Sequence, residues 1–199
     1  MSRRFWARRS DLPRGWSDLR DVSGLRFDIA YATPRNFTGA VVPGYEAPGA
    51  WLHARAAEAL AQAHRALSSN GLGILVFDAY RPRRASEHFV QWAQKNGRAD
   101  LVRDGFIAEH SLHNRGVALD LGLYRLDTRD AVDMGGPFDS FDERAHFTHA
   151  EGPALEARRH LRRVMEDREF RPYGKEWWHF TFAAEGFQAP AALDVVYRS

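Results

Sequence analysis

The sequence predicts a single α+β domain in which helices flank a central, mainly antiparallel sheet. Three observations favour this class. The 199 residues, 44% of them hydrophobic, suffice for one domain with its own core. Helical and strand patterns are interspersed without a regular βαβ repetition, which is typical of α+β proteins. No repeat or low-complexity linker divides the chain, so we expect one domain over residues 1–199, with a flexible basic N-terminal segment over about residues 1–20.

The first half of the chain predicts short extended pieces, then a helix, a strand and a helix. Residues 25–46 contain extended stretches interrupted by turn-forming glycines and prolines. Residues 48–70 carry apolar positions at helical spacing, and a glycine follows as a typical helix end. The apolar run at residues 73–77 predicts a buried strand. A second helix is expected over residues 82–96, beginning at a proline and ending before a glycine.

The second half predicts two further strands and one further helix. Residues 117–124 alternate with period two, so that Asp120 lies among small residues on the face opposite four apolar side chains. A loop-rich segment follows, with a short helix near residues 141–149. A third helix with one apolar face is expected over residues 153–168, and a final strand over residues 177–182.

The composition excludes several classes of protein. No apolar run approaches the roughly 20 residues of a membrane-spanning helix. The chain has no cysteine, which excludes disulfides, thiolate metal sites and a cysteine nucleophile. Because the net charge is only +2 and basic residues alternate with acidic ones, we expect no nucleic-acid partner and no membrane partner. No hydrophobic segment follows the basic N-terminus, so we expect a cytoplasmic protein, with a periplasmic location left open.

One candidate for chemistry is the segment Ser-Leu-His-Asn-Arg-Gly-Val-Ala-Leu-Asp at residues 111–120. His113 precedes Gly116, where the chain can turn sharply before the strand begins. Asp120 has small neighbours on its face of the strand, which leaves open space above its carboxylate. A core strand rarely leaves such space, whereas a pocket needs it.

The second candidate is the stretch Lys-Glu-Trp-Trp-His-Phe at residues 175–180. Glu176 and His179 are three residues apart and would point to opposite faces of a regular strand. The same parity problem separates His113 from Asp120. The chain must therefore bend at both motifs if these groups are to share one site.

If both bends exist, these groups match a catalytic zinc site. Two imidazoles and one carboxylate leave a fourth coordination position open. The spare Glu176 would be the general base for a metal-activated water, and Arg81 would stabilise an oxyanion as a fixed cation. The two tryptophans would exclude water and so strengthen the charge interactions.

Each of these residues also has a structural explanation. The chain has nine histidines, so a pair is easily chosen, and His146 and His149 also have a ligand-like spacing. Arg81 alone is more often half of an ion pair, here with Asp78. The tryptophan pair alone would belong to the core.

Three segments in this order resemble the signature segments of the zinc D-alanyl-D-alanine dipeptidases of the VanX type. They are Asp78-Ala-Tyr-Arg-Pro82, residues 111–120 and Glu176-Trp-Trp-His179. The similarity runs from about residue 25 to residue 182. It implies the fold of the hedgehog and D,D-peptidase superfamily.

The resemblance also implies a role for each candidate residue. One zinc ion per chain would be bound by His113, Asp120 and His179. Glu176 would be the base, and Arg81 would steady the tetrahedral intermediate.

Three further residues are expected near the substrate by the same resemblance. Ser111 corresponds to a residue beside the substrate in the family. Asp139 and Asp142, in an acidic loop, would provide a counter-charge for the free amino group of a dipeptide.

We therefore expect a zinc metallopeptidase that hydrolyses D-alanyl-D-alanine, or a close D,D-dipeptide, to free amino acids. Two alternatives stay open. A D,D- or L,D-carboxypeptidase of peptidoglycan stem peptides would share the metal site and differ in cleft length. A non-catalytic zinc-stabilised binding domain would need neither Glu176 nor Arg81. The expected partner is a small dipeptide, and an apolar surface patch would be compatible with a homodimer.

Overall fold

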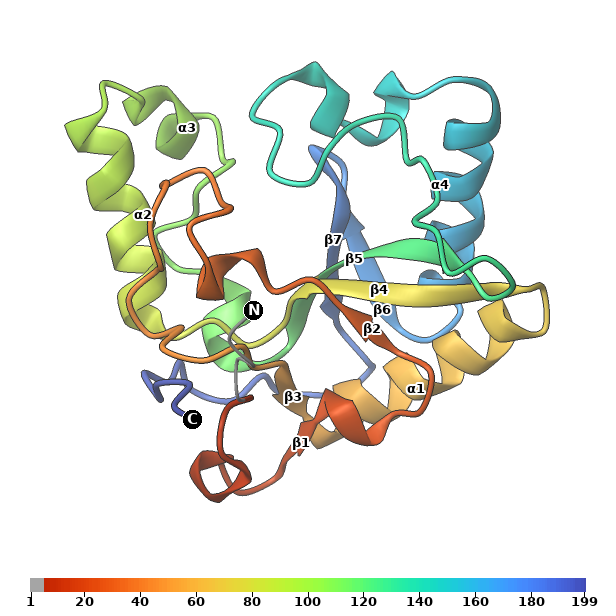
Figure 1. The fold of residues 1–199 in the computed structure, drawn as a ribbon, viewed down its shortest axis with the longest axis horizontal. Coiled ribbons are helices and arrows are strands. Elements are labelled where there is room, and N and C mark those ends of the chain that lie inside the picture. The colour runs from red at the N-terminus through yellow and green to blue at the C-terminus, as the bar shows by residue number, and fades with distance from the viewer. Residues whose placement is uncertain (1–5) are drawn as a thin grey trace.

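The computed structural model describes residues 6–199 and has a mixed α and β architecture built around one sheet (Figure 1). This sheet has five strands in the order β2-β4-β5-β7-β6. All its neighbouring strands pair antiparallel except β2 and β4, which are parallel. The expected mainly antiparallel α+β fold is therefore confirmed. The strands are β2 (Arg26–Phe27), β4 (Leu72–Asp78), β5 (Ala118–Arg125), β6 (Phe170–Tyr173) and β7 (Glu176–Phe182).

Helices cover the sheet and one of its ends (Figure 1). Helices α1 and α4 pack against each other, and they also contact β4 and β6 respectively. Helices α2 and α3 pack together at the end of the sheet where β4 ends and β5 begins. No helix of residues 6–199 is long and apolar enough to span a membrane. The bounds are α1 (Ala54–Ser68), α2 (Arg83–Lys95), α3 (Ala99–Arg103) and α4 (Gly152–Glu166).

The three predicted helices are confirmed, but the first begins later than expected. Residues 51–53 form strand β3 (Trp51–His53), which pairs antiparallel with β1 (Trp16–Asp18). The short helix predicted near residues 141–149 is two separate 3-10 turns. The 3-10 turns of the chain are Arg9–Asp11, Leu19–Asp21, Ala30–Ala32, Leu112–Arg115, Glu143–Ala145 and Phe147–His149.

Part of the basic N-terminal segment is buried, its flexibility stays a prediction, and the first five residues lie outside the described part of the chain. Strand β1 joins the small second sheet with β3, and Leu19 is fully buried. Buried apolar residues alternate with the arginines in this segment, so its basic charge alone did not indicate that part of it is packed.

The chain bends at both motifs, as a shared site requires. At the first motif Gly116 adopts a left-handed conformation (φ 62°) and closes the 3-10 turn that carries His113. A side chain at Gly116 would overlap the ring of Trp16, so only glycine fits there. At the second motif β7 pairs with β5 only from Thr181 back to His179, and its pairing with β6 shifts register next to Glu176.

Candidate metal centre and active site

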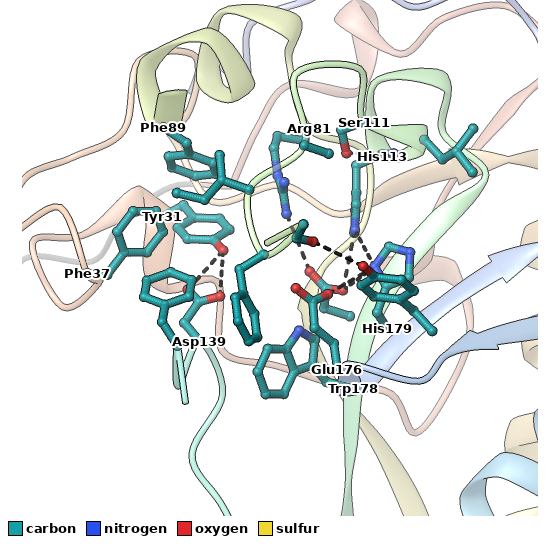
Figure 2. A pocket seen from close by; sticks show the side chains of 18 of the residues that line it. Tyr31, Phe37, Arg81, Phe89, Ser111, His113, Asp139, Glu176, Trp178 and His179 are labelled. Atoms are coloured by element: carbon teal, nitrogen blue, oxygen red, sulfur yellow. Dashed lines mark hydrogen bonds and ion pairs between the residues drawn. The ribbon is translucent and has the colours of Figure 1, made fainter. Parts of the chain in front are cut away.

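Three side chains from three elements converge on one point beside the sheet (Figure 2). His113 comes from the 3-10 turn, Asp120 from β5 and His179 from β7. Asp120 and His179 are direct cross-strand partners, so the sheet register places them together. A ring nitrogen of each histidine and a carboxylate oxygen of Asp120 all lie within 4.8 Å of one another.

The distances within this cluster fit a bound cation. Nε2 of His113 lies 3.2 Å from Nδ1 of His179, and these nitrogens lie 3.3 and 3.0 Å from Oδ1 of Asp120. Two imidazole nitrogens and one carboxylate oxygen are the ligand set of catalytic zinc sites. The predicted bends and the predicted convergence of the three residues are thus present in the structure.

The protonation of these groups also suits metal binding. Nδ1 of His113 lies 2.7 Å from the carbonyl oxygen of Ala79, which can only accept a hydrogen bond. Nδ1 therefore carries the proton, and the lone pair of Nε2 faces the cluster. Burial lowers the pKa of His179, which favours the neutral ring that a metal needs. Burial opposes ionisation of Asp120, but His113 and His179 together hold its pKa well below the usual value.

Glu176 stands at the edge of the cluster, where its carboxylate lies within ion-pair distance of His179 and is otherwise free. Its Oε2 lies 3.9 Å from Nδ1 of His179, and its side chain is 13% exposed. Within residues 6–199 no hydrogen bond reaches this carboxylate. Burial, reinforced by the charges of Asp120 and Asp139, raises its pKa well above the usual value. A carboxylate with a raised pKa is suited to accept and release a proton during a reaction.

Arg81 takes part in an ion pair and also lines the cavity. Its Nε donates to Oδ2 of Asp78 at 2.9 Å, and its Nη2 lies 3.4 Å from Oδ2 of Asp120. The guanidinium also lies over the rings of Tyr31 and Phe89, at 5.5 and 5.1 Å from their centroids. The sequence left two explanations of Arg81 open, an ion pair with Asp78 and a cation that faces the site, and the geometry is compatible with both.

Asp78 is a site residue that the sequence indicated only as an ion-pair partner. It is fully buried, and its backbone lies opposite that of Asp120 in the pairing of β4 with β5. Its carboxylate accepts a hydrogen bond of 2.6 Å from the hydroxyl of Tyr45. Asp78 thus fixes the orientation of Arg81. The sequence signal for this role was the position of Asp78 at the end of an apolar strand, three residues before Arg81.

The cluster forms the floor of a small cavity with aromatic walls (Figure 2). The cavity has a volume of about 340 Å³, which suits a small ligand. Trp178 lines it directly, whereas Trp177 lines a different cavity together with Gly122 of β5. Both tryptophans are buried in the core, and Trp178 is also a wall of the cavity above the cluster. The aromatic lining residues are Tyr31, Phe37, Phe89, Phe106, Phe141, Tyr173 and Trp178.

Two of the three predicted substrate-binding residues face this cavity. Ser111 lines it, and its hydroxyl accepts a hydrogen bond from the backbone N–H of His113 at 3.3 Å. Asp139 also lines it and accepts a hydrogen bond of 2.9 Å from the hydroxyl of Tyr31. Burial, with the nearby charge of Asp120, raises the pKa of Asp139 to about 7. An ammonium group bound beside Asp139 would favour its ionised form.

Asp142 and the two remaining candidate histidines lie apart from the cluster. The carboxylate of Asp142 pairs with Arg144 at 2.6 Å and is absent from the cavity lining. Its side chain instead caps the adjacent 3-10 turn. The ring of His146 stacks on Phe106, and His149 lies 3.8 Å from Glu143.

A floor whose side chains could hold a cation, beside a carboxylate in a small cavity, is the arrangement of a metallopeptidase site. The chain belongs to the D-Ala-D-Ala dipeptidase family, Peptidase_M15, whose family model matches residues 14–195. The resemblance of the three motifs is thereby confirmed, and the chain is a peptidase of this family.

Curated relatives support the same assignment. The chain is 40% identical over 181 residues to the D-alanyl-D-alanine dipeptidase of Enterococcus faecium, with 83% of this chain and 90% of the relative covered. It is 39% identical, with the same coverage, to the D-alanyl-D-alanine dipeptidase of Enterococcus faecalis (strain ATCC 700802 / V583). Among solved structures, a vancomycin resistance D,D-dipeptidase in complex with a D-Ala-D-Ala phosphinate analogue matches with a TM-score of 0.47 and 21% identity. That match covers 73% of this chain and 56% of the other.

Proposed function

We propose that this peptidase hydrolyses D-alanyl-D-alanine, or a close D,D-dipeptide, to free amino acids with zinc as its cofactor. The observation that carries the proposal is the convergence of His113, Asp120 and His179 beside the free carboxylate of Glu176. The membership of the D-Ala-D-Ala dipeptidase family supports the substrate class.

The zinc ion would be held by Nε2 of His113, Nδ1 of His179 and a carboxylate oxygen of Asp120. Zinc in such a set supplies a Lewis acid that polarises oxygen atoms and acidifies water. The chain contributes the orientation of the ligands. The carbonyl of Ala79 fixes the ring of His113, and the hydroxyl of Thr181 lies 3.2 Å from Nε2 of His179.

Glu176 is the general base in this proposal. Its carboxylate accepts a proton from the attacking water and returns it to the nitrogen of the broken peptide bond. The positive charge of a bound ion favours the ionised form of Glu176, while burial favours the protonated form. These opposing effects keep the group able to accept and to release a proton within one cycle.

Arg81 and Asp139 interact with two different charged groups of the substrate. Arg81, held by Asp78, offers a fixed cation to the oxygen that becomes negative during hydrolysis. Asp139 binds the free ammonium group of the dipeptide, and Ser111 contacts a polar group of the substrate. The aromatic walls exclude water, which strengthens each of these interactions. Because Asp142 lies outside the cavity, it has no role in this proposal.

The experiment that tests the proposal compares the three dipeptides D-Ala-D-Ala, L-Ala-D-Ala and L-Ala-L-Ala with the zinc-loaded chain. Alanine release from D-Ala-D-Ala alone is expected. A pentapeptide stem assayed in parallel separates a dipeptidase from a carboxypeptidase. Preference for the stem, or hydrolysis of the L,L-dipeptide alone, would overturn the proposed function.

A further inference from the structure

The loop between β5 and α4 has to place Asp139 accurately, although it has little regular structure. It runs over residues 126–151 and includes two short 3-10 turns, Glu143–Ala145 and Phe147–His149. Asp139 has a left-handed backbone (φ 58°), which residues other than glycine seldom adopt. A loop with this conformation at its ligand-facing residue needs support from outside itself.

Arg158 of α4 provides such support. The side chain points from the helix into the protein and is 1% exposed. Helix α4 lies directly beside the loop in Figure 1. Its guanidinium donates hydrogen bonds to four backbone carbonyls of the loop: from Nε to Met134 (2.5 Å), from Nη2 to Arg144 (2.8 Å), and from Nη1 to His146 (2.6 Å) and Phe147 (3.3 Å).

These four carbonyls belong to the two ends of the loop segment that carries Asp139. Met134 precedes Asp139, and the other three residues follow it. The two ends also touch directly, since a side-chain carbon at Gly136 would lie 2.7 Å from the carbonyl oxygen of Arg144. Arg158 therefore closes residues 134–147 into a ring, with Asp139 on the part that reaches Tyr31 and the cavity.

The charge of Arg158 is not explained by an ion pair. Within residues 6–199 no carboxylate lies within ion-pair distance of its guanidinium. Burial lowers the pKa of Arg158 to about 10, and the charge of Asp133 offsets this only in part. The guanidinium also lies 5.5 Å from the centroid of the Trp177 ring. A planar group with five N–H donors suits several carbonyls at once, which a lysine could not reach together.

We propose that Arg158 is a positioning residue for substrate binding, which holds Asp139 in place by joining the two ends of residues 134–147. The inference rests on the proposed function, in which Asp139 binds the ammonium group of the dipeptide. Arg158 contacts none of the metal ligands or Glu176. Its loss should therefore raise KM and leave kcat nearly unchanged.

The test compares Arg158→Met and Arg158→Lys with the control Arg159→Met in the full-length, zinc-loaded chain. Arg158→Met should raise KM for D-Ala-D-Ala by about tenfold or more, with kcat and zinc content nearly unchanged. Arg158→Lys should recover only part of this loss. Arg159 lies on the same helix, is exposed and pairs with Glu156, so the control should keep the original KM.

A double-mutant cycle shows whether Arg158 acts through Asp139. In an Asp139→Asn background, Arg158→Met should raise KM by less than about twofold. An equal increase in both backgrounds would overturn the proposal. A fall in kcat without a change in KM would overturn it as well.

Amide hydrogen exchange tests the same proposal without substrate. In Arg158→Lys, faster exchange should be confined to residues 134–147. Unchanged exchange there, or a uniform increase over the sheet and helices, would contradict the positioning role. This measurement also covers the case in which Arg158→Met does not fold. If the original chain hydrolyses none of the dipeptides, the proposed function fails, while the exchange result still decides whether Arg158 holds residues 134–147 in place.

Discussion

The floor of the cavity and its outer wall are built in different ways. The floor consists of His113, Asp120 and His179, whose positions follow from strand register and from the turn at Gly116. The wall contains Asp139 and a set of aromatic rings that come mostly from helices, turns and loops. A metal centre tolerates little displacement of its ligands, and paired central strands provide that rigidity. Ligand recognition is placed on loops that a scaffold supports.

This difference separates the expected effects of substitutions. Changes in the floor should remove the metal or the chemistry, whereas changes in the wall should alter substrate binding. The following predictions test that separation, beginning with the largest expected effect.

Removal of a floor ligand should abolish both metal binding and turnover. Asp120→Ala leaves two histidines without their shared carboxylate, so zinc affinity should fall sharply. Activity should drop by about 10³-fold or more. Zinc competition with a chelator and a dipeptide assay measure the two effects. A variant that retains stoichiometric zinc would show that the floor is not the metal site.

Glu176→Gln should stop turnover while zinc remains bound. The substitution keeps the shape of the side chain and removes its ability to accept a proton, so kcat should fall by about 10³-fold. Metal analysis of the purified variant should give the same zinc content as the original chain. Substantial residual turnover would rule out Glu176 as the base, and loss of zinc would make it a ligand.

Arg81→Lys should have a smaller effect than either floor change. Lysine keeps the charge but cannot pair side-on with Asp78, so the cation loses its fixed position. We expect kcat to fall by about 10²-fold with little change in zinc content. Arg84→Lys is the matched control, because Arg84 pairs with Asp194 outside the cavity. Equal effects of the two substitutions would contradict a role in catalysis.

Asp139 in the wall and Asp142 outside the cavity should differ. Asp139→Asn removes the negative charge that faces the cavity and should raise KM for the free dipeptide by about tenfold. Asp142→Asn disturbs an exposed ion pair with Arg144 and should change KM by less than about twofold. Steady-state kinetics of both variants decide the point. A larger rise in KM for Asp142→Asn than for Asp139→Asn would contradict this assignment and would place Asp142 in the substrate site.

Most of the floor could be predicted from the sequence because its residues lie in compact motifs. The motifs predicted both bends as conditions of a shared site, and Gly116 marks one of them. The strands and long helices followed from apolar periodicity. Helix α3 and strands β1, β3 and β6 were missed because elements of three to five residues are too short for a periodic signal.

The wall was harder to predict because its residues depend on tertiary contacts. Nothing local distinguishes Asp139 from Asp142, and only the structure shows that Arg144 pairs with the second. Arg158 lies three residues before Leu161 and seven before Met165, so helical spacing was the available signal for its burial, whereas the carbonyls that it binds had none. The cytoplasmic location and the homodimer stay predictions, which subcellular fractionation and sedimentation of the purified protein can test.

Anomalous diffraction at the zinc edge from a crystal of the zinc-loaded chain tests the central claim most directly. The account predicts one peak per chain, coordinated by His113, Asp120 and His179, with Glu176 close by and not bound to the ion. A peak elsewhere, or a fourth bond from Glu176 that completes the coordination, would contradict it.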